Sequence, residues 1–90
     1  MITGRQVRAA RALLNWKQET LAEKALVALT ALKRLESERG LATHEGTRDN
    51  VRRALEAAGV LFLRTDQGRG VLLLDNPDAP QGKGVMRRRG

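Results

Sequence analysis

The stretch from Gln18 to Glu36, QETLAEKALVALTALKRLE, constrains the fold of this chain more than any other. Its apolar residues recur at intervals of three and four, which is the period of a helix that buries one face. We therefore expect two short amphipathic helices, over about residues 18–24 and 28–36. Their apolar stripes would be formed by Leu21, Ala22 and Ala25 and by Ala28, Ala31, Leu32 and Leu35.

The second of these helices has a free face opposite its apolar stripe. The residues predicted on that face are Leu29, Thr30, Lys33 and Arg34. Two cations and a hydroxyl on the free face of a short helix suit insertion beside the phosphates and base edges of DNA. The segment of residues 25–27 between the two helices is so short that the chain must reverse sharply there.

This stretch resembles the helix-turn-helix of Cro and phage repressors, the XRE family, over about residues 3–58. The matching residues are Arg11, Gln18, Leu21, Ala22, Val27, Leu32, Leu35 and Glu36. The resemblance implies a four-helix repressor-like domain in which the second motif helix reads DNA bases. The base-contacting residues would then be Leu29, Thr30, Lys33 and Arg34.

The resemblance also implies roles for residues around the recognition helix. Gln18, Arg39 and Thr43 would contact DNA phosphates, and we add the neighbouring cation Lys17. A buried ion pair between Arg11 and Glu36 would fasten the first helix of the domain to the recognition helix.

Three positions depart from the family pattern. Leu26 stands where glycine is usual, so either the turn differs or it carries strain of about 1 kcal/mol or more. Lys17 and Ala28 replace the Ser or Thr that usually caps each motif helix. Each missing cap costs roughly 0.5–2 kcal/mol and removes a hydroxyl that could meet a phosphate.

Further helices are predicted on both sides of this stretch. The first begins at a capping box formed by Thr3 and Gln6 and ends at Asn15, which tolerates the left-handed backbone of a helix end. The fourth is expected to take Thr47 as its N-cap and to stop at Gly59.

Residues 60–74, VLFLRTDQGRGVLLL, read as a β-hairpin around a turn that contains Asp66, Gly68 and Gly70. Both faces are apolar, and so small a domain can cover only one of them. We therefore expect hairpins from two chains to meet in a dimer. The expected contact residues are Val60, Phe62, Val71 and Leu73. The competing interpretation is a hairpin that folds back over Trp16 and the first helix of its own chain.

Charge points to a polyanionic partner. The chain carries a net charge of +7 on 90 residues. Residues 75–90, rich in Pro and Gly, contribute only two of these charges and read as a flexible basic tail. The expected organisation is a helix-turn-helix domain over residues 1–59, a hairpin over residues 60–74 and the tail over residues 75–90. Nucleic acid is the first expected partner.

Several functional classes find no support in the sequence. The chain has no cysteine and one histidine, His44, so neither a metal site nor a catalytic nucleophile is expected, and no cofactor is implied. Its longest apolar runs, residues 60–63 and 71–74, are far too short to span a membrane. We expect a cytoplasmic protein that is not an enzyme.

The expected fold is therefore mainly α, a four-helix Cro/repressor-like domain followed by a C-terminal hairpin. The expected function is sequence-specific binding of double-stranded DNA as a transcriptional regulator, a repressor, acting as a homodimer on an inverted repeat. The alternative is a helix-turn-helix scaffold that binds a protein partner, like an antiactivator or an antitoxin. The missing caps, Leu26 and the apolar Leu29 motivate this alternative.

Overall fold

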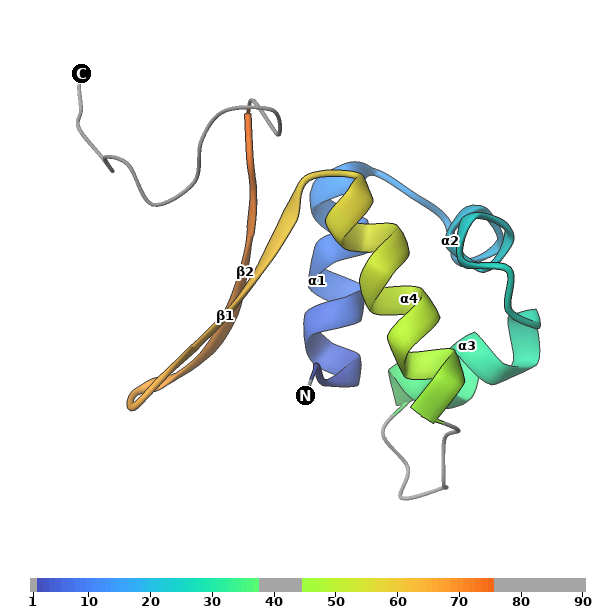
Figure 1. Cartoon of the computed structure of the whole chain (residues 1–90), viewed down its shortest axis with the longest axis horizontal. Helices are drawn as coiled ribbons and strands as arrows, with labels where there is room; N and C mark the ends of the chain where they lie inside the picture. The colour runs from blue at the N-terminus through green and yellow to red at the C-terminus, as the bar shows by residue number, and fades with distance from the viewer. Residues whose placement is uncertain (1, 38–44, 76–90) are drawn as a thin grey trace.

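The computed structural model describes residues 2–37 and 45–75, which form four helices followed by a two-stranded antiparallel hairpin (Figure 1). The helices are α1 (Gly4–Leu14), α2 (Gln18–Ala25), α3 (Leu29–Ser37) and α4 (Glu45–Ala57). The strands are β1 (Val60–Thr65) and β2 (Gly68–Leu73). The prediction of a mainly helical fold that ends in a hairpin is confirmed. The expected tail, from residue 76 onward, lies outside the described residues.

Local sequence signals set both ends of α1. The Thr3 hydroxyl accepts a hydrogen bond from the Gln6 backbone N–H at 3.2 Å, and Gln6 Oε1 accepts one from the Thr3 N–H at 3.0 Å. This reciprocal arrangement is the predicted capping box. Asn15 ends the helix in the left-handed conformation, with a φ of 58°. An asparagine tolerates this conformation better than most side chains.

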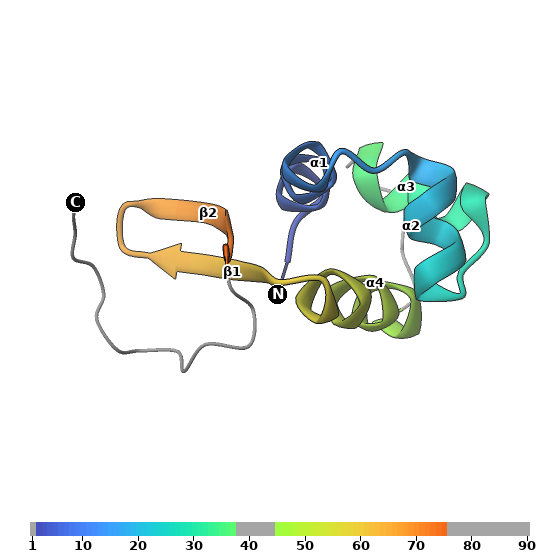
Figure 2. The same cartoon turned by 90° about the horizontal axis from the view of Figure 1, so that it is seen from above.

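All four helices contribute to one apolar core, which the hairpin extends. Figure 2 shows α1 between the hairpin on one side and the α2–α3 pair on the other. The fully buried residues with the largest side chains are Val7, Leu21, Leu32, Val51 and Leu55. Ala28, expected in the apolar stripe of α3, is instead exposed, because α3 begins one residue later and Ala28 precedes its first turn.

The reversal between α2 and α3 is made by Leu26, whose φ is 58°. A leucine in this left-handed region costs about 1–2 kcal/mol relative to a right-handed conformation. Its side chain is 85% exposed, so little apolar burial offsets the strain. Of the two outcomes expected for this turn, the chain therefore adopts the strained one. No side-chain hydrogen bond caps α2 at Lys17.

The start of α4 differs from the prediction. The helix begins at Glu45, so Thr47 lies inside its first turn and is not the N-cap. A carboxylate in the first turn interacts favourably with the helix dipole, and Glu45 also lies 3.7 Å from Arg48 Nε. These interactions favour a start two residues before the threonine.

The hairpin turn is also shorter than predicted. Thr65 pairs with Gly68, so the loop is Asp66 and Gln67 alone, and Gly68 and Gly70 lie in β2. The Thr65 hydroxyl accepts hydrogen bonds from the N–H groups of Gln67 and Gly68, which closes this tight loop.

One face of the hairpin packs against the helices within the same chain. This inner face carries Val60, Phe62, Val71 and Leu73, all of which pack in or against the core. Alternation along the strands places Leu61, Leu63 and Leu72 on the outer face, where Leu63 and Leu72 are exposed. Among residues 2–37 and 45–75, no helix is both long enough and apolar enough to cross a bilayer.

Candidate nucleic-acid interface

The exposed side of α3 is a polar and basic stripe. Thr30, Lys33, Arg34 and Ser37 are all exposed. They follow one another at i, i+3, i+4 and i+7, the spacing that places residues on one face of a helix. Three of the four residues predicted to contact bases therefore lie on this stripe. Ser37 was missed, although the same spacing counted one turn further along the helix identifies it.

Leu29 does not belong to that stripe. It is half-buried and packs against the core. Its spacing of three and seven from Leu32 and Glu36, which are both buried, explains this position. Leu29 was expected on the free face, and the structure corrects this expectation.

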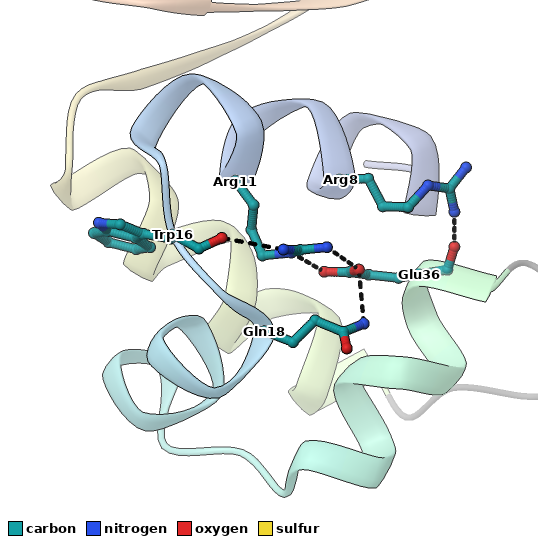
Figure 3. A network of polar contacts seen from close by, with 5 residues as sticks. All are labelled: Arg8, Arg11, Trp16, Gln18 and Glu36. Atoms are coloured by element: carbon teal, nitrogen blue, oxygen red, sulfur yellow. Dashed lines mark hydrogen bonds and ion pairs between the residues drawn. The ribbon is translucent and has the colours of Figure 1, made fainter.

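A buried carboxylate holds α3 against α1 and α2 (Figure 3). Glu36 is 2% exposed, and its two oxygens accept hydrogen bonds from Arg11 Nε at 2.7 Å and Arg11 Nη2 at 2.8 Å. Paired contacts of this kind are short, strong and fixed in orientation. The structure thus contains the ion pair expected between Arg11 and Glu36.

Further hydrogen bonds complete this arrangement. Gln18 Nε2 donates to Glu36 Oε1 at 3.0 Å, and Arg11 Nη1 donates to the Trp16 carbonyl at 3.1 Å. Arg8 donates to the Glu36 carbonyl at the end of α3. We call the residues Arg8, Arg11, Gln18 and Glu36 the Glu36 network. It ties three helices together and fixes the angle at which α3 presents its stripe.

The predicted phosphate contacts have different outcomes. Gln18 is half-buried, and its side-chain amide nitrogen donates to Glu36. Lys17 is exposed at the start of α2. Arg39 and Thr43 lie outside the described residues.

The charges of α4 are balanced on the helix itself. Arg52 pairs with Asp49 and Glu56, and Arg53 pairs with Asp49 at 2.9 Å. The hydrogen bond with Asp49 raises the pKa of Arg52 above its ordinary value. In contrast, no ion pair joins Lys33 or Arg34 to a carboxylate within the described part of the chain.

The four residues expected at a dimer contact face their own chain. Val60 is 3% exposed, and Phe62, Val71 and Leu73 pack against the core. A partner that docks on the outer face of the hairpin would not meet these side chains. The competing interpretation, a hairpin that folds back on the first helix, is correct for this face. The outer face carries Leu61, which is half-buried, and the exposed Leu63 and Leu72.

Gln6 attaches the hairpin to α1, a role that the sequence did not reveal. It is 6% exposed, and its Nε2 donates to the Gly70 carbonyl at 2.9 Å and to the Leu63 carbonyl at 3.2 Å. The acceptors are backbone carbonyls, which every residue carries, so no sequence pattern could have identified them.

Comparison of the chain with protein-family models and with curated proteins finds no match. The resemblance to Cro and phage repressors therefore stays an expectation based on residues and spacing. Within residues 2–37 and 45–75, no group of three or more His, Asp or Glu side chains is placed to hold a metal ion.

Proposed function

We propose that this chain is a double-stranded DNA-binding transcriptional regulator, a repressor, that works in the cytoplasm by binding and not by catalysis. The observation that carries the proposal is the exposed stripe of α3, whose cations have no carboxylate partner among residues 2–37 and 45–75, on a helix held by the Glu36 network. A dimer would place two copies of α3 in successive major grooves, about 34 Å apart, on an inverted repeat.

Arg34 is the proposed base reader, through a two-pronged hydrogen bond to guanine, with Thr30 beside it. Lys33 and Lys17 would hold phosphates and set the register of the protein on the duplex. The start of α2 supports this assignment, because no side chain caps its first N–H groups at the positive end of the helix dipole. We no longer assign Leu29 to base reading.

The second copy would dock on the outer face of the hairpin. Of the four large apolar residues exposed in the described part of the chain, Leu63 and Leu72 lie close together there, with Leu61 directly opposite Leu72. The hairpin also has two unpaired strand edges. Burial of these side chains against a second copy would remove apolar surface from water.

The test is fluorescence anisotropy with DNA from upstream of the protein's own gene, at several salt concentrations and against excess random duplex. Arg34→Ala is expected to cost about 1–3 kcal/mol of binding free energy and to relax specificity at one base pair. Lys17→Ala is the matched control, because it also removes one exposed cation. It should weaken all duplexes alike and reduce the salt slope by about one.

The outcomes separate the possibilities. Two chains per duplex are expected at saturation. If both substitutions weaken specific and random duplexes equally, α3 does not read bases. If excess random duplex abolishes binding to the upstream fragment, the protein holds that fragment through charge alone.

Leu26 favours a second candidate, a scaffold that binds a protein partner. It has a strained backbone and is 85% exposed in the α2–α3 turn. A leucine in this position does not stabilise the isolated chain, so its presence needs another explanation. A bulky residue with a positive φ is an outlier, and backbone strain of this kind gathers at functional sites such as contact surfaces. Absence of DNA binding even at low salt would favour this candidate over the first.

A further inference from the structure

A groove of about 700 Å³ lies between the first half of α1 and the tip of the hairpin. Its walls are Thr3, which caps α1, then Arg5, Gln6 and Ala9 of α1, and residues 64–71 of the hairpin. Figures 1 and 2 both place α1 between the hairpin and α3, so the groove lies on the side of α1 away from α3.

Two arginines face each other across the hairpin at this groove. Arg64 is the direct cross-strand partner of Arg69. Both share the inner face with Phe62 and Val71, because side chains alternate along a strand, and both line the groove.

The register brings these two residues especially close. The Leu74 N–H donates to the Gly59 carbonyl, and Thr65 and Gly68 close the two-residue loop. Hydrogen-bonded and non-hydrogen-bonded pairs alternate along an antiparallel ladder, which makes Arg64–Arg69 a non-hydrogen-bonded pair. The Cα atoms of such a pair lie about 4.5 Å apart, closer than in the hydrogen-bonded kind.

Like charges placed directly opposite each other destabilise a hairpin. Within the described residues, no ion pair joins Arg64 or Arg69 to a carboxylate, although Asp66 lines the same groove. Arg5 of α1 adds a third guanidinium to the groove, although it is also engaged in another interaction. The opposed pair is therefore a cost to the isolated chain that an anion in the groove would offset.

We propose that this groove binds a small phosphate-bearing ligand, such as a nucleotide. Arg64 and Arg69 would each offer a planar set of N–H donors, which suits phosphate oxygens. The first turn of α1 adds the positive end of a helix dipole. The groove volume is in the range of small-molecule sites. The inference is independent of the proposed DNA binding.

The experiment titrates inorganic pyrophosphate into the ¹⁵N-labelled chain at constant ionic strength, with inorganic phosphate as the weaker probe. We expect amide shifts confined to the first turn of α1 and to residues 64–70, together with a rise in Tm. Arg64→Gln and Arg69→Gln should each lower the affinity about tenfold or more, the loss expected for one charge-assisted contact. Arg53→Gln is the control, because it removes the same charge from α4, away from the groove.

A second readout separates a ligand site from a structural role. Without ligand, Arg64→Gln and Arg69→Gln should each raise the Tm, because the opposed charges are relieved. A lower Tm would show that the arginines stabilise the fold, which would overturn the proposal. The proposal would also be overturned if pyrophosphate shifted amides over the whole basic surface. The same holds if Arg64→Gln and Arg53→Gln showed equal pyrophosphate-induced amide shifts.

Duplex DNA distinguishes the source of the phosphate. If the ligand is a small molecule, Arg64→Gln leaves the affinity for duplex unchanged in the absence of pyrophosphate. If duplex displaces pyrophosphate and Arg64→Gln weakens duplex binding, the groove holds the DNA backbone and the small-molecule proposal is wrong.

Discussion

Helix α1 carries two polar attachments that are built differently. On the side toward α3, the Glu36 network joins a guanidinium to a carboxylate that is 2% exposed. On the side toward the hairpin, the neutral amide of Gln6 donates to two backbone carbonyls. Removing the partner of a buried charge costs much stability, because the remaining charge is left uncompensated. Removing Gln6 costs less, because the strand carbonyls keep their hydrogen bonds within the ladder. We therefore expect α3 to be held rigidly and the hairpin to be held more loosely.

The largest expected effect comes from removing the carboxylate. Glu36→Leu leaves Arg11 half-buried without its counter-charge, and we expect a loss of about 3 kcal/mol in the free energy of unfolding. Urea denaturation followed by circular dichroism measures it.

The double variant Arg11→Met/Glu36→Leu is the control for this loss. It removes both charges and should recover much of the stability, because an apolar pair of similar size has no desolvation penalty. If the double variant is as unstable as the single one, the loss does not come from an unpaired buried charge.

A smaller effect is expected at the hairpin. Gln6→Ala removes both bonds to the strand carbonyls and half of the capping box, at a cost of about 1–2 kcal/mol. Hydrogen exchange should rise more in β1 and β2 than in α3, because the hairpin loses its polar attachment.

Thr3→Ala is the matched comparison for Gln6→Ala. It removes the other half of the capping box and costs about 1 kcal/mol, but it leaves the bonds from Gln6 to the hairpin intact. Equal hairpin exchange in the two variants would mean that Gln6 acts on α1 alone and does not hold the hairpin.

The smallest effect is a gain in stability at the turn that orients α3. Leu26→Gly relieves the left-handed backbone and loses little burial, so we expect about 0.5–1 kcal/mol of added stability. Asn15→Gly, at the other non-glycine residue with positive φ in the described chain, should gain less because asparagine tolerates this conformation. Thermal unfolding compares the two. A loss at Leu26 would show that its side chain stabilises the folded monomer.

The sequence by itself determined the four helices and both ends of α1, because these features depend on neighbours along the chain. Thr3 with Gln6 predicted the start of α1, Asn15 its end, and the spacing of Thr30, Lys33 and Arg34 predicted the free face of α3. Leu29 was misplaced although its spacing of three residues from Leu32 and seven from Glu36 places it toward the buried side of α3. The expected cap at Thr47 was wrong because a sequence pattern leaves the start of a helix uncertain by one or two residues.

The tertiary structure alone decided which face of the hairpin is covered and what attaches it. Both faces are apolar, so the pattern could not choose between a partner chain and α1 for Val60, Phe62, Val71 and Leu73. The pair Arg64–Arg69 depended in the same way on the cross-strand register, which the two-residue loop sets. Contacts between residues distant in sequence are set by packing and by backbone groups that all residues share, and a single sequence does not encode them in any local pattern.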